Sequence, residues 1–531
     1  MLLTFSMPVV PAEAALTCVK DWSDKMKISE LIRKLDYHFN TLKGEAITDP
    51  AKARELRGTT ISGIVNDSRK VIKDSLFFCI VGAKKDGHEY ARQALLDGAA
   101  VLVVQKDLDL SDLEGKTPVE EPVIIRVQDT RYAMAYIAAA YYGDPASEMK
   151  IIGVTGTKGK TTTTYMVKSI LEASGIRTGL IGTIEILYGD VRLPAPNTTP
   201  ESTVLQKTFR DMADAGIQAV VMEVSSQALK LHRTQGFLFD LGIFTNLSPD
   251  HIGKDEHKDF NEYLQCKSLL FRQCKAGIFN ADDPHYKEVM AGHTCSVETY
   301  GIGNKADLYA ENLELIKKPG ELGVSFDVKG LMDFHAEVPT PGRFSVYNAL
   351  CAIAVCRHFD VTPDKIQKAL REVRVRGRIE MVRVSDDFTL MIDYAHNAMA
   401  LSSLLSSLRE YEPHRLVCLF GCGGNRDPER RFEMGEASGK LAELTIITSD
   451  NPRDEEPMAI IDNIVTGISR TDGKYVTIPD RKEAIRYAIR HGEPGDIVIL
   501  AGKGHEDYQE IKGHKYPMDE RVLIREILEE E

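Results

Sequence analysis

A glycine-rich segment, GVTGTKGKTTTT, spans residues 153–164 and most strongly limits what this chain can fold into. Ile151 and Ile152 precede it, and Tyr165, Met166 and Ile170 follow at a spacing that could line one face of a helix. In a strand–loop–helix unit of this kind, glycines let backbone N–H groups approach phosphates, and the helix N-terminus favours an anion. The segment therefore predicts an α/β domain that binds a nucleotide.

The loop departs from the strict phosphate-loop pattern, because Val154 stands where that pattern requires a glycine. Lys160 still supplies a point charge, and Thr161 can offer its hydroxyl to Mg²⁺. An ordinary glycine-rich turn is the alternative, but the lysines and the run of hydroxyls disfavour it. No guanine-reading Asn-Lys-x-Asp motif occurs, which favours ATP. The predicted ATP-binding residues of the loop are Gly156, Thr157, Lys158, Gly159, Lys160, Thr161 and Thr162.

Short apolar runs that end in polar residues recur along the chain. QAVVMEVSS and LGIFTNLSPD follow the loop, and LMIDYAH, RLVCLFGCGG, LTIITSDNPR and DIVILAGKGHE follow residue 376. Such runs are typical of buried parallel strands with their chemistry at the carboxyl ends. We therefore expect an α/β protein with a central P-loop ATPase-like parallel-sheet domain, a C-terminal Rossmann-like domain and a small N-terminal α/β domain.

The length of 531 residues is enough for three or four domains. Residues 1–25 read as a disordered leader; a signal peptide is the alternative, but the segment lacks a basic start and prolines interrupt it. Residues 26–127 form the small α/β unit, 128–375 the central ATP-binding domain and 376–531 the C-terminal domain. A β-rich stretch is expected near residues 295–340, and KISELIRKL near the start is expected to be a helix.

The overall charge is acidic, with a formal net charge of −13 and a pI of about 5.6. This balance argues against a nucleic-acid partner, although a local basic pocket could still hold an anionic substrate. The nine cysteines are irregularly spaced and contain no CxxC pair, which favours reduced thiols in a cytoplasmic protein. No apolar stretch is long enough to predict stable membrane insertion.

Two further candidates lie just past strand ends. Glu223 closes the run QAVVMEV, and His251 follows TNLSPD. A carboxylate in this position can hold a magnesium ion directly or through water. A surface acid and a structural histidine are the ordinary alternatives. The neighbouring serines and the strand-end position favour a metal role for both.

Several segments in a fixed order resemble the Mur ligase family. They are VTGTKGKTTT, MEVSSQALKLHR, FTNLSPDHIGKDEHKDFNEYLQCKSLLF, PGRFSVYNALCAIAV, RGRIEMV and DYAH. The resemblance runs from about residue 60 to the C-terminus. It implies an ADP-forming ligase of cytoplasmic peptidoglycan synthesis, and hence of cell-wall biogenesis, cell shape and division. Such an enzyme transfers the ATP γ-phosphate to a carboxylate, and an amine then attacks the acyl phosphate.

The resemblance also implies roles for individual residues. Lys160, Glu223, His251 and Lys267 match catalytic positions; Lys267 matches a lysine that becomes carbamylated and, with Thr161, Glu223 and His251, serves magnesium. A solvated helix lysine is the alternative for Lys267. Further ATP contacts carry over to Asn348, Arg378, Asp393 and His396, so ATP would lie between two domains that close over it. DYAHNAMAL departs from the family's usual DYAHTPDAL but keeps Asp393 and His396.

The substrate motifs point to the family members that add the third residue of the peptide. The implied contacts to the UDP-sugar and its dipeptide are Ser68, Asn197, Thr198, Thr199, Ser225 and Arg233. SSQAL replaces the commoner SSHAL, and Leu231 stands where some relatives use Gln, which puts one polar contact in doubt.

The motif TSDNPRDE resembles that of the members that add meso-diaminopimelate, whose distal carboxylate suits a bidentate arginine. The implied pocket comprises Arg426, Asp450, Asn451, Pro452, Arg453, Gly502 and Glu506. Addition of L-lysine is the alternative within the family, whereas a folylpolyglutamate synthetase is disfavoured by the N-terminal DSR and DGH segments. A non-catalytic nucleotide-binding regulatory protein is the alternative of another class. We expect small-molecule partners only and a monomer.

Overall fold

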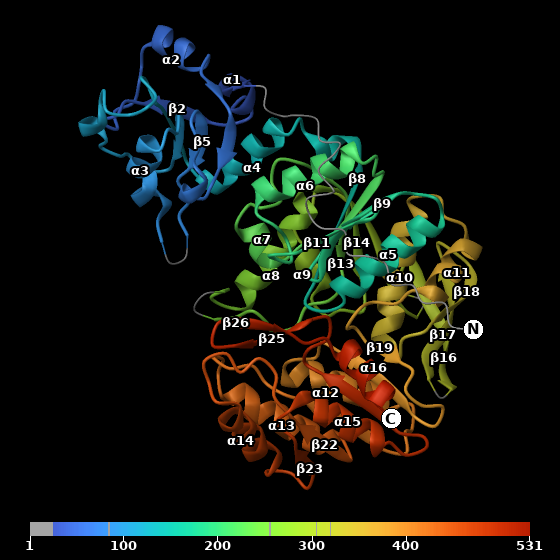
Figure 1. Cartoon of the computed structure of the whole chain (residues 1–531). Coiled ribbons are helices and arrows are strands. Elements are labelled where there is room, and N and C mark those ends of the chain that lie inside the picture. Colours follow the sequence, from blue (N-terminus) through green and yellow to red (C-terminus); the bar gives the residue numbers. More distant parts are fainter. Residues whose placement is uncertain (1–24, 83–84, 254–255, 304, 319, 531) are drawn as a thin grey trace. The chain divides into compact units, whose positions relative to one another are not determined.

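The structure, a computed structural model, describes residues 25–530 except residues 83, 84, 254, 255, 304 and 319 (Figure 1). The predicted leader, apart from residue 25, lies outside the described residues. The chain divides into two compact units. Of the described residues, the first contains those within 25–164, 175–279 and 283–298, and the second contains those within 165–174, 280–282 and 299–530. Across the part of the chain that is described, no helix has both the length and the apolarity to span a bilayer.

The first unit begins with a five-stranded sheet in the order β2-β7-β6-β5-β4. Its strands are β2 (Tyr37–Asn40), β4 (Gly63–Val65), β5 (Ser75–Phe78), β6 (Val101–Val104) and β7 (Val123–Val127). Side chains alternate between two cores, because Leu76 and Phe78 face one cluster and Phe77 faces another. The surrounding elements are β1 (Met26–Lys27), α1 (Ile28–Leu31), α2 (Pro50–Leu56), β3 (Thr60–Ile61) and α3 (Ala91–Leu96).

Seven consecutive strands of a second, 11-stranded sheet are described with this unit, in the order β11-β10-β9-β12-β8-β13-β14. The strands are β8 (Lys150–Thr155), β9 (Thr178–Ile181), β10 (Glu185–Tyr188), β11 (Val191–Pro194), β12 (Ala219–Glu223), β13 (Phe239–Phe244) and β14 (Cys274–Asn280). Strands β9, β12, β8, β13 and β14 run parallel. The carboxyl ends of β8, β12 and β13 therefore meet at one edge, where Thr155, Glu223 and Phe244 end their strands.

Helices flank this sheet and carry much of its core. They are α4 (Thr130–Tyr141), α6 (Ser202–Asp214), α7 (Ser226–Lys230), α8 (Phe260–Ser268) and α9 (Tyr286–Met290). Helix α5 (Lys160–Ala173) follows the glycine loop and belongs to the second unit from residue 165 onward. Leu205, Phe209 and Met212 of α6 pack with strand residues such as Val220 and Met222. The predicted strand–loop–helix unit is thus β8, the glycine loop and α5.

The second unit contains the predicted β-rich stretch, with strands in the order β15-β16-β17-β18. Their bounds are Ser296–Ile302, Leu308–Lys318, Glu321–Gly330 and Phe334–Val338. Two helices follow, α10 (Arg343–Arg357) and α11 (Pro363–Glu372). The segment RFSVYNALCAIAVCRHF forms α10 as predicted, and most of its apolar side chains are buried.

The C-terminal sheet has six strands in the order β19-β20-β24-β21-β22-β23. They are β19 (Glu380–Val382), β20 (Thr389–Asp393), β21 (Leu416–Phe420), β22 (Leu444–Ile447), β23 (Lys474–Thr477) and β24 (Ile497–Ala501). Each face has its own core: α12 (Ala398–Arg409), α13 (Glu429–Leu441) and α14 (Pro457–Ile468) cover one, and α15 (Arg481–Arg490) and α16 (Glu520–Glu530) cover the other. A hairpin of β25 (Tyr508–Ile511) and β26 (His514–Pro517) follows β24.

One local feature differs from the sequence predictions. The helix expected over KISELIRKL forms only α1, four residues long, because Lys27 pairs with Thr60 in strand β1 and the backbone leaves the helical conformation at Ile32. The eight described cysteines are free thiols, as predicted for them.

Candidate active site

The glycine loop between β8 and α5 folds around two lysine side chains. The Lys160 ammonium donates to the carbonyl oxygens of Gly156 at 2.9 Å and Thr157 at 3.1 Å, and the Lys267 amine donates to Gly156 O at 3.0 Å. Gly156 has a φ of +147°, and a Cβ there would lie 1.9 Å from Thr245 Oγ1. Glycine is therefore required where the backbone approaches the end of β13.

Asn246 fixes the opposite side of the loop. Its side-chain oxygen accepts from Lys158 N at 2.9 Å, and its carbonyl accepts from Thr157 N at 2.9 Å. The Lys158 ammonium lies 3.3 Å from an Asp250 carboxylate oxygen. Sequence reasoning missed Asn246, although its place just past the β13 run was a usable signal.

Glu223 lies at the end of β12 and is buried, with 1% of its surface exposed. Its carboxylate accepts from Thr161 Oγ1 at 3.0 Å, Thr183 N at 2.8 Å and Thr183 Oγ1 at 3.1 Å. The structure thus brings together the predicted pair Thr161 and Glu223. It adds Thr183, which sequence reasoning missed although it closely follows the apolar run of β9.

Lys267 on α8 is also buried, with 1% of its surface exposed. Burial and the neighbouring Lys160 ammonium lower the pKa of Lys267 well below its usual value. Its nitrogen lies 4.4 Å from the centre of the Tyr263 ring. Burial and Lys160 both disfavour the charged ammonium, and burial to this extent excludes the solvated-lysine alternative.

His251 is more exposed to solvent than Glu223 and Lys267. Its side chain is 52% exposed, its φ is +54°, and its Nδ1 lies 3.0 Å from Glu256 Oε1. Among the residues that the structure describes, no group of three or more His, Cys, Asp or Glu side chains could hold a metal ion. The metal role of His251 stays a prediction.

Several residues predicted to bind the muramoyl-dipeptide lie next to Glu223 and its partner Thr183. Thr199 Oγ1 donates to Glu223 O at 2.9 Å and accepts from Ser225 N at 3.0 Å, and Thr198 Oγ1 lies 3.0 Å from Thr183 Oγ1. Arg233 donates to Thr199 O at 3.0 Å. Asn197 is exposed beside this group, and Ser68 begins a short 3₁₀ helix in the N-terminal domain.

In the second unit, three predicted nucleotide contacts surround Tyr394. The Arg378 guanidinium lies 4.6 Å from the Tyr394 ring centre, and His396 Nδ1 lies 2.9 Å from Tyr394 O. Asp393 accepts from Ile379 N at 2.9 Å and Ala395 N at 2.8 Å, which fixes the turn after β20. Asn348 is buried in α10.

A cavity of about 140 Å³ lies at the carboxyl ends of β21, β22 and β24. Arg426, Asp450, Asn451, Arg453, Gly502 and Glu506 all line it, and Pro452 lies between two of them in the chain. Burial raises the pKa of Asp450. Burial alone would raise the pKa of Glu506, but the Lys503 ammonium outweighs it and lowers the value.

Three models of the Mur ligase family match successive parts of the chain. Residues 60–142 match the model of the Mur ligase family catalytic domain, 154–356 that of the Mur ligase middle domain, and 377–504 that of the Mur ligase glutamate ligase domain. The UDP-N-acetylmuramoyl-L-alanyl-D-glutamate–2,6-diaminopimelate ligase of Caldanaerobacter subterraneus subsp. tengcongensis is 44% identical over 88% of this chain and 95% of its own length. The chain belongs to the Mur ligase family.

Other relatives of this Mur ligase have the same name. The enzyme of Alkaliphilus metalliredigens is 41% identical over 95% of this chain and 98% of its own length. A solved structure of a ligase with that name is 27% identical, has a TM-score of 0.66, and covers 91% of this chain and 97% of its own. The predicted family and three-domain α/β fold are confirmed.

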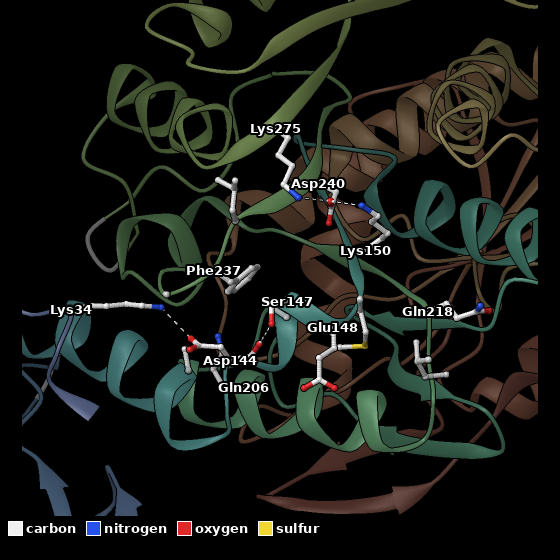
Figure 2. Close-up of a pocket in the computed structure, with 16 residues that line it drawn as sticks. Lys34, Asp144, Ser147, Glu148, Lys150, Gln206, Gln218, Phe237, Asp240 and Lys275 are labelled. Atoms are coloured by element: carbon white, nitrogen blue, oxygen red, sulfur yellow. Dashed lines mark hydrogen bonds and ion pairs between the residues drawn. The ribbon is translucent and has the colours of Figure 1, made fainter. Parts of the chain in front are cut away.

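A larger cavity of about 750 Å³ lies at the opposite, amino-terminal edge of the central sheet of this Mur ligase (Figure 2). Asp240 pairs there with Lys150 at 3.2 Å and Lys275 at 2.8 Å, and Lys34 lies 3.3 Å from Asp144. None of the predicted site residues lines it. Its charged groups neutralise one another, so the cavity offers little net charge to a ligand.

Proposed function

We propose that this Mur ligase joins meso-2,6-diaminopimelate to UDP-N-acetylmuramoyl-L-alanyl-D-glutamate with conversion of ATP to ADP and phosphate. The observation that carries the proposal is the convergence of Arg426, Asp450, Asn451, Arg453, Gly502 and Glu506 on one cavity. A mixed set of cationic and anionic groups suits a substrate whose far end carries both an ammonium and a carboxylate. The shared name of the curated relatives supports the same choice.

The proposed reaction has two steps. An oxygen of the D-glutamate side-chain carboxylate attacks the γ-phosphorus, the bond to the ADP oxygen breaks, and an acyl phosphate forms. An amino group of diaminopimelate then attacks the acyl carbon, and phosphate leaves from the tetrahedral intermediate. Positioning and charge neutralisation provide most of the catalysis in phosphoryl transfer. Lys160 and the loop N–H groups hold the phosphates, while Thr199, Ser225 and Arg233 orient the dipeptide.

The chemistry of the Glu223 site fits the magnesium ion that the family implies. The recorded partners of this buried carboxylate are two threonine hydroxyls and one backbone N–H, all neutral, so a cation would balance its charge. Thr161 and Glu223 supply the oxygen donors that Mg²⁺ prefers. When bound, the ion neutralises phosphate charge. The lowered pKa of the buried Lys267 amine suits carbamylation, in which its nitrogen adds to CO₂ and a proton is released.

A non-catalytic regulatory role is less well supported, because Lys160, Thr161, Glu223 and Lys267 are all packed at one sheet edge. Substrates of this kind are made in the cytoplasm, and we propose that location for the protein. Addition of L-lysine is the second candidate, since Arg453 already has an internal counter-ion in Glu510.

Phosphate release tests the proposed function. The purified protein is assayed with ATP, Mg²⁺ and UDP-N-acetylmuramoyl-L-alanyl-D-glutamate, with either meso-diaminopimelate or L-lysine. We expect release that depends on the dipeptide and prefers meso-diaminopimelate. K160A should abolish it, whereas K207A, which removes an exposed lysine from α6, should not. Preference for L-lysine would overturn the amino-acid assignment, and near-wild-type turnover of K160A would overturn the role of the loop.

A further inference from the structure

Arg453, at the cavity of the second unit, has a backbone conformation that the hairpin β25–β26 holds in place. Its φ is +53°, in the left-handed region that is unfavourable for a residue other than glycine. Arg453 N donates to Glu510 O at 3.0 Å, and Lys512 N donates to Arg453 O at 2.8 Å. These two bonds join the loop after β22 to the hairpin and set the direction in which the Arg453 side chain leaves the backbone.

The Arg453 guanidinium is held through two of its three nitrogens. Its Nε donates to Glu510 Oε2 at 3.1 Å, and its Nη1 donates to Gly424 O at 2.7 Å. A guanidinium has five N–H groups, so these two bonds leave three on the Nη1 and Nη2 edge, which can bind a carboxylate in bidentate fashion. Arg453 lines the cavity and Glu510 does not. Glu510 therefore affects a bound substrate indirectly, by positioning Arg453.

The other charged group predicted to recognise the substrate's far end also has an internal partner. The Lys503 ammonium is fully buried and donates to Glu506 Oε2 at 2.7 Å and Asn451 Oδ1 at 3.0 Å. Asn451 in turn accepts from Glu510 N at 2.9 Å through the same oxygen. Lys503 thus neutralises Glu506 as Glu510 neutralises Arg453, and the two pairs share Asn451.

We propose that Glu510 is a positioning residue that sets amino-acid specificity in this Mur ligase. This proposal rests on the proposed function. It holds the Nε edge of Arg453 so that the Nη edge faces the cavity. It also supplies a counter-charge that competes with the distal carboxylate of diaminopimelate. An amino acid without that carboxylate does not leave Arg453 unpaired, so the preference for diaminopimelate is smaller than a lone arginine would give.

Two substitutions separate the charge of Glu510 from its hydrogen bond. E510Q keeps an oxygen that can accept from Arg453 Nε but removes the charge, whereas E510A removes both. The main-chain bonds of residue 510 to Asn451 and Arg453 do not involve its side chain, so both variants retain them. E436Q is the matched control, because Glu436 on α13 pairs with Lys440 and Arg470 away from the cavity.

Steady-state kinetics with meso-diaminopimelate, and with L-lysine as a competitor, test the proposal. In E510Q we expect the KM for diaminopimelate to fall about fivefold, the effect of removing one nearby like charge, while L-lysine inhibits more weakly. In E510A the KM should rise, because the guanidinium is no longer oriented. The kcat and the KM values for ATP and the UDP-dipeptide should stay unchanged in both, and E436Q should match the wild type throughout.

Several results would overturn the proposal. One is a KM for diaminopimelate that is unchanged in E510Q, and another is a KM that rises equally in E510Q and E510A. A third is L-lysine inhibition of equal strength in the wild type and E510Q, or no inhibition of either. A wild-type enzyme that releases no phosphate with diaminopimelate contradicts the proposed function instead. Thermal unfolding midpoints close to that of the wild type establish that neither variant acts through loss of the fold.

Discussion

Among single residues, Lys267 has the most unusual environment for its type. A lysine ammonium is strongly hydrated, yet this side chain is fully buried beside a second lysine and donates to the carbonyl of Gly156. Both surroundings disfavour the charged form. Neutral amines are nucleophiles, so an environment that disfavours the ammonium supports the proposed carbamylation.

Substitution of Lys267 by Ala should therefore remove both a covalent adduct and most of the activity. We expect kcat to fall by about 10²- to 10³-fold, the usual cost of losing one preorganised electrostatic group. With ¹³C-labelled bicarbonate, the wild type should give a carbamate carbon signal by NMR that K267A lacks. K275A, at the opposite edge of the same sheet, is the control and should retain both. A carbamate signal that persists in K267A would contradict the assignment.

At the scale of helices and strands, the sequence predicts those elements whose type follows from local pattern. The runs of β8, β12, β13, β20, β21, β22 and β24 are short, largely apolar and followed by polar residues, so the sequence predicts both the strands and the chemistry at their carboxyl ends. Strand β23 was not predicted, because it lies at a sheet edge and is largely exposed. The pairing of the hairpin β25–β26 with Arg453 was also missed, since a contact between distant segments is a tertiary property.

The turn of this hairpin can be tested without changing any side chain at the cavity. Lys512 and Gly513 have φ of +48° and +76° and connect paired residues Ile511 and His514, a two-residue turn that favours glycine. G513A should cost the hairpin about 1 kcal/mol. We expect a KM for diaminopimelate raised severalfold and an unchanged KM for ATP. G189A makes the matching change in the β10–β11 turn and should leave the diaminopimelate KM unchanged; equal effects of the two would contradict this role for the hairpin.

For the whole molecule, the balance of charge does not reveal the chemistry of the sites. The chain carries a net charge of −13, yet the residues proposed to hold phosphates and carboxylates include Lys160, Arg233 and Arg453. Each of these cations is held by hydrogen bonds to nearby oxygens of its own unit. Recognition of anionic substrates thus depends on local positioning of a few cations, and the acidic remainder favours solubility.

Acid should destabilise the protein well before its carboxylates titrate. Burial, with the nearby Arg378 guanidinium, lowers the pKa of His505 to about 4, against the usual 6.5. The unfolded chain takes up this proton below pH 6.5 and the folded chain only near pH 4, so the free energy of unfolding falls between these values. Asp496 affects stability at lower pH. Burial alone would raise the pKa of Asp496, but hydrogen bonds from Arg415 lower it. The stabilisation that the ionised carboxylate contributes is therefore lost as pH falls below 3.8.

Urea unfolding between pH 7.5 and 4 measures this effect. We expect the wild type to lose stability steadily below pH 6.5. H505F has no proton to gain and should show a shallower loss, by up to one proton in the slope, whatever its stability at neutral pH. H514F removes an exposed histidine of the hairpin and should keep the wild-type slope. Identical slopes for H505F and the wild type would mean that His505 is protonated equally in the folded and unfolded chains, and its burial beside Arg378 would then have no energetic consequence.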